Sequence, residues 1–190
     1  MLMALDTETG GLDPITRPLL SVALWCPEQK FHVRVKANRP CDRKALEINK
    51  LDPEMGVEPQ VAAEHLLLWW KGMGSPRIEL VGQNVGPFDV PFFKQLMHCG
   101  VDLPWDLMFD YHYRDTATLA LACMDAGLLP RGKKSLGALC EMLNIHFSAH
   151  DSLQDAMAAW HVWHRLIVAV SMNQRIRDKY DFEPIDVRTA

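Results

Sequence analysis

The order of strand-like and helix-like segments predicts an α/β protein with a mixed five-stranded sheet flanked by helices. Three strand patterns come first, which favours an antiparallel start to the sheet. Two later strand patterns each follow a helix-length segment, which favours parallel addition to the same sheet. With 190 residues and no internal repeat, the chain is long enough for one domain with a substantial core.

Apolar runs near the N-terminus predict the first three strands. Residues 2–7 (LMALDT) form the first pattern, and residues 19–25 (LLSVALW) and 30–35 (KFHVRV) form two more, with CPEQ between them as a hairpin turn. The stretch KANRPCD then predicts an irregular region because of its proline, and residues 43–50 (RKALEINK) predict a short helix within that region.

The middle of the chain alternates helix and strand patterns. Residues 59–72 have helical periodicity and end at a glycine, and residues 77–84 (RIELVGQN) predict the fourth strand. Residues 89–100 (DVPFFKQLMHCG) predict a helix that stops at Gly100, and residues 108–115 (MFDYHYRD) predict the fifth strand.

Helical patterns at residues 116–127, 135–144 and 152–170 complete the predicted domain. The last of these has apolar residues on most of its faces, so we expect it to be well buried. We expect a single domain over residues 1–172. The tail at residues 173–190 has mixed charge and weak patterning, and no role is predicted for it.

Composition and charge narrow the class of protein. The net charge of -4 gives no general attraction for nucleic acid, so a polyanionic partner has to be held by local groups. Five scattered cysteines without C-x-x-C spacing favour free thiols over disulfides or a zinc site. No apolar segment reaches the length of a membrane span, and no signal-peptide pattern is present. We expect a cytoplasmic protein, bacterial or phage-encoded, without a membrane partner.

Two carboxylates interrupt the first predicted strand. Asp6 and Glu8 alternate with Thr7, so their side chains share one face with Cα atoms about 7 Å apart. Unpaired carboxylates are costly to bury, and converging carboxylate oxygens suit a hard cation such as Mg²⁺ or Mn²⁺. Gly10 and Gly11 then let the backbone approach a ligand closely. The polar edge of a surface strand is the alternative for an isolated D-x-E pattern.

Two further acids stand at element ends where ligand sites form. Asp89 follows a predicted strand and a glycine-containing turn, and Asp155 lies in the first turn of the last predicted helix, five residues after His150. Each has a structural alternative. Asp89 has the position of a helix N-cap, and Ser152 with Asp155 has the spacing of a capping box.

Three motifs in this order resemble the DEDDh group of 3′–5′ exonucleases, which includes polymerase proofreading subunits and ribonuclease T. They are DTETGGL at residues 6–12, the N-x-x-x-F-D block that ends at Asp89, and HDSLQDA at residues 150–156. The resemblance spans about residues 3–165 and implies a ribonuclease H-like fold. It also implies a general base, His150, and two Mg²⁺ or Mn²⁺ ions held by Asp6, Glu8, Asp89 and Asp155.

The same resemblance implies where the 3′-terminal nucleotide binds. Leu12 would lie against the terminal base, and Phe88 against the sugar or base, with ordinary packing as the alternative for both. The full set of implied substrate contacts is Thr7, Gly11, Leu12, Asn84 and Phe88. The basic run Arg131, Lys133 and Lys134 is either a further phosphate contact or a solvated loop.

The sequence departs from the family pattern at two places. The interval from Asn84 to Asp89 is one residue longer than is common, and Gln83 stands where a histidine is frequent. Gly10 stands where the family commonly has threonine. These departures concern the contacts with substrate more than the implied metal ligands.

The expected function is a two-metal-ion 3′–5′ exonuclease that releases nucleoside 5′-monophosphates from the 3′ end of DNA or RNA. A single-stranded end is the expected substrate, and a polymerase or repair protein is a candidate partner. Two alternatives remain open: a ribonuclease H-like endonuclease, and a non-catalytic nucleic-acid-binding or polymerase-accessory subunit. The presence of all five catalytic residue types counts against the second.

Overall fold

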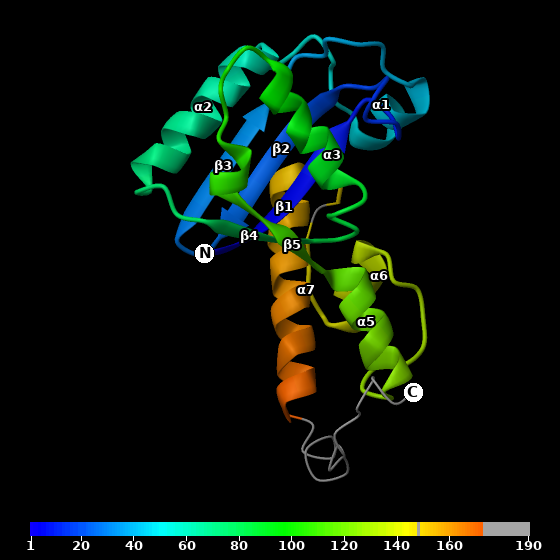
Figure 1. The fold of residues 1–190 in the computed structure, drawn as a ribbon. Helices are drawn as coiled ribbons and strands as arrows, with labels where there is room; N and C mark the ends of the chain where they lie inside the picture. Colours follow the sequence, from blue (N-terminus) through cyan, green and yellow to red (C-terminus); the bar gives the residue numbers. More distant parts are fainter. Residues whose placement is uncertain (148, 173–190) are drawn as a thin grey trace, which may run out of the picture.

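Strand β1 (Leu2–Thr9) lies at the centre of a five-stranded sheet with the order β3-β2-β1-β4-β5 (Figure 1). The structure is a computed structural model that describes residues 1–147 and 149–172, so the tail at residues 173–190 lies outside the described residues. The other strands are β2 (Leu19–Cys26), β3 (Gln29–Arg34), β4 (Ile78–Gly82) and β5 (Phe109–Asp115).

The pairing of the strands confirms the predicted mixed sheet. β2 is antiparallel to both β1 and β3. β4 is parallel to both β1 and β5. The helices are α1 (Arg43–Asn49), α2 (Pro59–Gly72), α3 (Asp89–Phe93), the 3₁₀-helix η1 (Lys94–His98), α4 (Trp105–Met108), α5 (Thr116–Asp125), α6 (Leu136–Met142) and α7 (Ser152–Met172).

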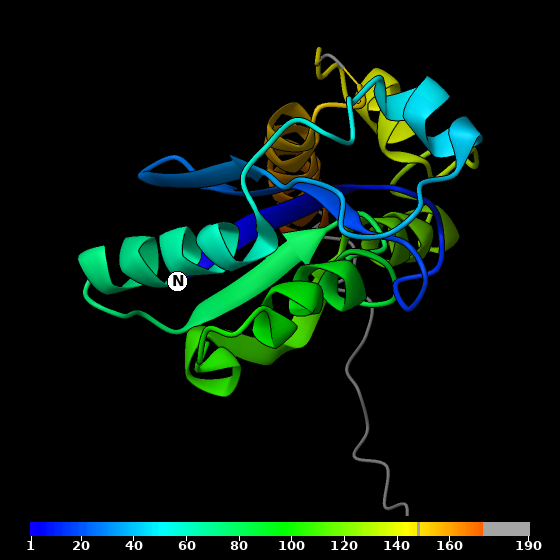
Figure 2. The ribbon, with the colours of Figure 1, turned by 90° about the horizontal axis from the view of Figure 1, so that it is seen from above.

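The two faces of the sheet are covered by different helices (Figures 1 and 2). On one face, large side chains of the sheet such as Leu5 pack with Leu66 of α2 and Phe92 of α3, and all three are fully buried. On the other face, α7 places Ala156 against Ala4 and further small residues of the sheet. Small side chains at this contact let the helix axis approach the sheet closely. The first turn of α7 is thereby seated directly on β1 and β2.

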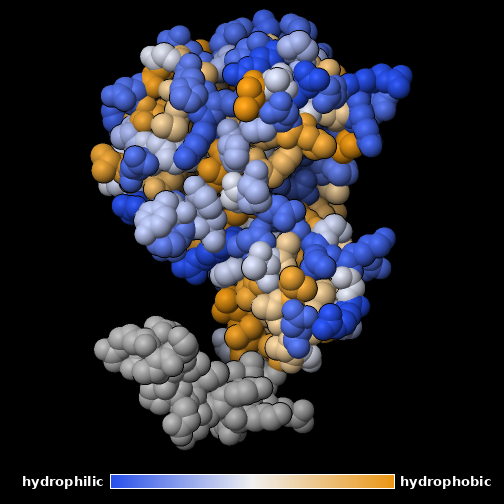
Figure 3. All heavy atoms as spheres, turned by 45° about the vertical axis from the view of Figure 1, so that its right-hand side comes forward, coloured by the Kyte–Doolittle hydropathy of each residue, from blue (hydrophilic) through white to orange (hydrophobic). Residues whose placement is uncertain are grey.

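Burial of α7 is close to the prediction in its first half and less complete in its second half, where Leu166 is nevertheless fully buried. Val162 is fully buried, whereas Ile167, Val168 and Val170 are 38%, 53% and 38% exposed. The helix has 21 residues and is therefore about 30 Å long, so its second half extends beyond the sheet (Figure 1). There it packs with α5 and α6, and Figure 3 shows hydrophobic side chains gathered on this lower part of the molecule.

Two local features differ from the predicted elements. The helix predicted over residues 89–100 is divided into α3 and η1, which agrees with the frequency of tight 3₁₀ turns at helix ends. α4 was not predicted, because four residues are too few to show helical periodicity. No helix within residues 1–147 and 149–172 has both the length and the apolar character of a membrane span.

Candidate active site

The carboxyl end of β1 provides two of the predicted acids. Asp6 and Glu8 pair with Ala23 and Ser21 of β2, and the register shifts between Glu8 and Thr9. Alternation along the strand turns both carboxylates toward the face that α7 covers. The irregularity after Glu8 ends regular pairing at the point where the chain enters its glycine turn, which is a common arrangement beside functional sites.

Asp89 reaches the same strand end from α3. It is 2% exposed, and its Oδ1 accepts hydrogen bonds from the backbone N–H of Thr7 at 2.9 Å and from the Thr7 hydroxyl at 2.7 Å. No side-chain cap is present at the start of α3, so the N-cap alternative for Asp89 is wrong. The carboxylate instead joins β1 to α3.

The N-terminus of α7 brings Asp155 and His150 to the site. The backbone N–H of His150 donates to Asp155 Oδ2 at 2.9 Å, and Asp151 Oδ1 accepts from the N–H of Gln154 at 3.0 Å. Asp151 therefore caps the helix, and the capping box of Ser152 with Asp155 is wrong. His150 has a φ of 68°, a left-handed conformation that is uncommon for residues other than glycine and is found at functional sites.

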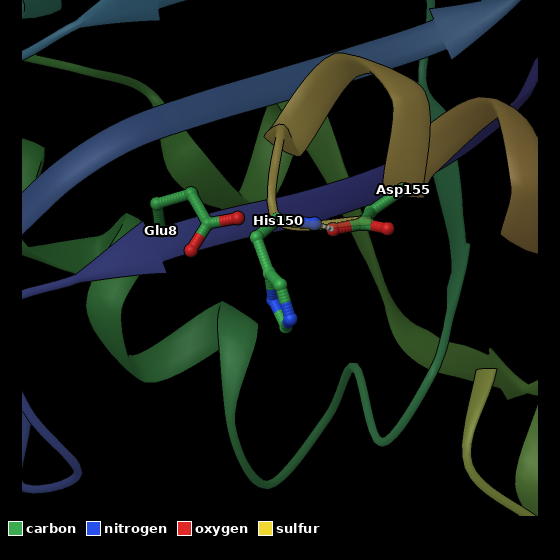
Figure 4. Close-up of side chains that lie close together, drawn as sticks. All are labelled: Glu8, His150 and Asp155. Carbon is green, nitrogen blue, oxygen red and sulfur yellow. Dashed lines mark hydrogen bonds between the residues drawn. The ribbon is translucent and has the colours of Figure 1, made fainter. Parts of the chain in front are cut away.

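Glu8, His150 and Asp155 form a compact group, although they come from β1 and from the start of α7 (Figure 4). One ligand-capable atom of each lies within 4.8 Å of the others. The His150 side chain is exposed and points away from the helix, while Asp155 is buried. The group thus combines two carboxylates with an imidazole that solvent can reach.

Burial raises the pKa of all four acids, and repulsion from neighbouring carboxylates adds to it. Burial is the largest cause for Asp6, whose pKa lies well above its ordinary value, and the charges of Asp89 and Asp155 raise it further. Burial also raises the pKa of Glu8 and of Asp89 to about 7. The pKa of Asp155 is raised, again mainly by burial. A site of this kind is destabilised when its carboxylates are charged, unless a cation is bound.

A pocket of about 580 Å³ opens beside these acids. The pocket lies between the end of β1 and helix α1, and the apolar side chains of Ala45 and Ile48 in α1 form part of its wall. Leu12 is 83% exposed at its rim. The pocket is lined by Thr7, Glu8, Thr9, Gly11, Leu12, Asp42, Lys44, Ala45, Ile48, Asn49 and Phe88. Four of the five implied substrate residues therefore surround one cavity. The fifth, Asn84, lies outside it.

Residues not predicted from the sequence hold this pocket together. Asn49 Nδ2 donates to the Thr9 carbonyl at 3.1 Å, and the N–H of Asp42 donates to the Gly10 carbonyl at 2.7 Å. These bonds dock α1 on the glycine turn. A Cβ on Gly10 would lie 2.6 Å from the Pro18 side chain, so close packing explains the glycine at this position. Single polar residues such as Asn49 carry no sequence signal for such a role.

Gln83 and Asn84 have structural contacts around the site. Gln83 Nε2 donates to the Lys134 carbonyl at 2.6 Å, and the Thr116 hydroxyl donates to Gln83 Oε1 at 2.5 Å. Gln83 therefore connects the end of β4 to the start of α5 and to the basic loop. Asn84 is exposed, has a φ of 55°, and accepts the N–H of Phe88 through its carbonyl.

Comparisons with solved structures show the same fold in two nucleases. Exonuclease I of E. coli, in complex with a dT13 oligonucleotide, has a TM-score of 0.70 and 18% identity, over 93% of this chain and 42% of its own. Cell-death related nuclease 4 (CRN-4) has a TM-score of 0.67 and 15% identity, over 88% of this chain and 63% of its own. The chain thus spans less than half the length of exonuclease I.

Sequence comparison defines the family. None of the curated proteins compared with the chain is significantly similar to it. The family model described as Exonuclease (RNase T), however, matches residues 3–163. This match covers most of the 190 residues, and the sheet has the ribonuclease H-like order. The chain therefore belongs to the RNase T exonuclease family, within the DnaQ-like DEDDh group.

Proposed function

We propose that the protein is a two-metal-ion 3′–5′ exonuclease that releases nucleoside 5′-monophosphates. The observation that carries this proposal is the compact group of Glu8, Asp155 and an exposed imidazole beside an apolar pocket. Asp6 and Asp89 lie close enough for their charges to interact with those of this group. Membership of an exonuclease family supports the reaction class. The four acids are Asp6, Glu8, Asp89 and Asp155, and the imidazole belongs to His150.

The donor set fits hard divalent cations. Carboxylate oxygens are the ligands that Mg²⁺ and Mn²⁺ prefer, and the repulsion that raises the pKa of Asp6 is relieved by positive charge. Asp6, Glu8, Asp89 and Asp155 would hold the ions, Mg²⁺ or Mn²⁺. When bound, a pair of such ions supplies an activated water and stabilises the charge of the leaving 3′ oxygen.

Other residues of the site would transfer the proton, orient a metal ligand and bind the substrate. His150 accepts a proton from the attacking water through its exposed imidazole. Thr7 orients Asp89 through two hydrogen bonds. Leu12 and Phe88 hold the terminal base and sugar by apolar contact, which tolerates every base. The implied backbone contact at Gly11 lies in the same pocket.

The proposed substrate is a single-stranded 3′ end of DNA, with RNA as the second candidate. A pocket of 580 Å³ has room for one nucleotide, and the similar exonuclease I was solved with single-stranded DNA. A polymerase or repair protein remains the proposed partner. All five cysteines are free, which agrees with a reducing cytoplasm.

Labelled oligonucleotides test this proposal. The protein is incubated with 3′- or 5′-labelled single- and double-stranded DNA and RNA, in Mg²⁺, Mn²⁺ or EDTA, beside Asp6→Ala and His150→Ala. We expect stepwise shortening from the 3′ end that EDTA and both substitutions abolish. Cleavage of a circular strand would identify an endonuclease instead. Binding without cleavage in either metal would identify a non-catalytic subunit.

A further inference from the structure

Two buried hydroxyls connect β2 to the first residue of α7. Ser21 Oγ lies 2.7 Å from Ser152 Oγ and 3.2 Å from Nε2 of His32 on β3. Ser21 and Ser152 are 2% and 1% exposed. Buried hydroxyls are costly to leave without a hydrogen-bond partner. Because hydrogen bonds are directional, the bond between Ser21 and Ser152 favours one relative position of β2 and α7.

The position of this hydroxyl pair relates it to the candidate active site. Ser21 is the β2 partner of Glu8 in the antiparallel ladder, so the two side chains share a face of the sheet. Ser152 follows His150 by two residues and precedes Asp155 by three. The pair therefore links the strand position beside one proposed ligand to the helical turn that carries another ligand and the proposed base.

The two other side-chain hydrogen bonds at the start of α7 do not link the helix to the sheet. The bonds from His150 N–H to Asp155 and from Gln154 N–H to Asp151 lie within the α7 segment, and fix its local shape. The apolar contact of Ala156 with the sheet buries surface but is not directional, whereas a hydrogen bond is. The hydrogen bond between Ser21 and Ser152 therefore restricts how the helix can move on the sheet.

We propose that Ser21 and Ser152 are positioning residues, which hold the first turn of α7 so that His150 and Asp155 keep a fixed distance from Glu8. This inference rests on the proposed exonuclease function. Neither serine is placed on the substrate or on the reacting atoms. Because Ala156 still packs against the sheet when the hydroxyls are removed, alanine variants are expected to fold.

Kinetics of Ser21→Ala, Ser152→Ala and the double variant test the proposal. A misplacement of catalytic groups by a fraction of an ångström lowers kcat, and we expect a loss of about tenfold or more in each single variant. KM for the oligonucleotide should stay unchanged. The double variant should lose no more than one single variant, since both changes remove the same contact. Ser171→Ala, whose exposed hydroxyl donates to the Ile167 carbonyl in the second half of α7, is the matched control.

An NMR measurement separates this inference from the proposed function. The imidazole signal of His150, assigned by comparison with His150→Ala, should shift or broaden in Ser21→Ala and Ser152→Ala but not in Ser171→Ala. This signal requires no activity, so an inactive wild-type protein would refute the exonuclease function alone. Lower melting temperatures with unchanged kcat and an unchanged His150 signal would overturn the positioning role. Fully additive losses of kcat would overturn it as well.

Discussion

Thr7 donates both its backbone N–H and its hydroxyl to the same oxygen of Asp89, at 2.9 and 2.7 Å. Two donors on Oδ1 favour the ionised carboxylate and oppose the effect of burial, which raises the pKa of Asp89 to about 7. They also fix the direction in which Oδ2 points. Thr7, which lies between Asp6 and Glu8 on β1, therefore influences both the charge and the orientation of the Asp89 carboxylate.

Thr7→Val should weaken metal binding at the site. The change keeps the β-branched shape and the backbone bond but removes the hydroxyl donor, so the pKa of Asp89 should rise further. We expect a loss of about tenfold in Mn²⁺ affinity near neutral pH, because a hydrogen bond to a charged group contributes about 1.5–3 kcal/mol. Isothermal titration calorimetry measures it, with Thr118→Val on exposed α5 as control. Equal affinities would show that the hydroxyl is dispensable.

Stability of the metal-free protein should fall as pH rises. The pKa of Glu8 is about 7 in the folded protein against 4.5 ordinarily, so the folded state binds this proton more tightly. The resulting stabilisation is complete below about pH 4 and is lost as pH rises through about 7. For Glu8 alone the shift corresponds to on the order of 3 kcal/mol. Asp89 behaves in the same direction.

Calorimetry at about pH 6 and pH 8, in EDTA and in Mn²⁺, checks this dependence. We expect a lower melting temperature at the higher pH in EDTA, and a larger rise on adding Mn²⁺ there, since the acids are then ionised. Glu8→Gln should flatten the pH dependence. A melting temperature that does not respond to Mn²⁺, although binding is confirmed by titration, would contradict the electrostatic account.

His150→Gln should abolish proton transfer while metal binding is retained. The backbone N–H that bonds Asp155 remains in this variant, so the carboxylate keeps its position. We expect kcat to fall by about 10²–10⁴-fold, with Mn²⁺ affinity changed little. His146→Gln, an exposed histidine four residues earlier on the same segment, is the control. A comparable loss in both variants would argue against a specific role for His150.

Leu12→Ser should weaken substrate binding without affecting the metal site. Leu12 is 83% exposed at the rim of the pocket, so its removal has little effect on folding. We expect KM for a single-stranded oligonucleotide to rise about tenfold, because full burial of a leucine side chain contributes about 1.5–3 kcal/mol. Leu68→Ser, at an exposed position on α2, is the control. Identical KM values would place the terminal base elsewhere.

The basic loop before α6 should contribute to binding through charge. Gln83 anchors this loop to the end of β4 through the Lys134 carbonyl. Replacing Lys133 and Lys134 by glutamate should weaken oligonucleotide binding and reduce the slope of log K against log salt by about two. Fluorescence anisotropy across a salt series measures the slope. An unchanged slope would identify a solvated loop.

Regular elements were predictable because their patterns are local. The strands near Leu5 and Leu80 are short, largely apolar runs, and both lie buried in the core of the sheet. The motif residues Asp6 and Asp155 were predictable as a set, since the resemblance fixes their order along the chain. The burial of α7 was overestimated, because apolar periodicity does not reveal where the sheet beneath a helix ends.

Contacts between distant residues were not predictable from such patterns. Ser152 has a spacing typical of a capping box, yet its hydroxyl bonds Ser21 from 131 residues away, while the neighbouring Asp151 caps the helix. Asn49 shapes the pocket by a bond to the Thr9 carbonyl. Each of these is a single polar side chain whose partner is decided by tertiary packing rather than by its sequence neighbours.

The proposed ion ligands come from β1, α3 and α7, which lie near the beginning, the middle and the end of the described chain. A nascent polypeptide on the ribosome therefore has no complete set of ligands until α7 has emerged and docked. On the proposed function, nuclease activity would therefore appear only after α7 has docked on the sheet.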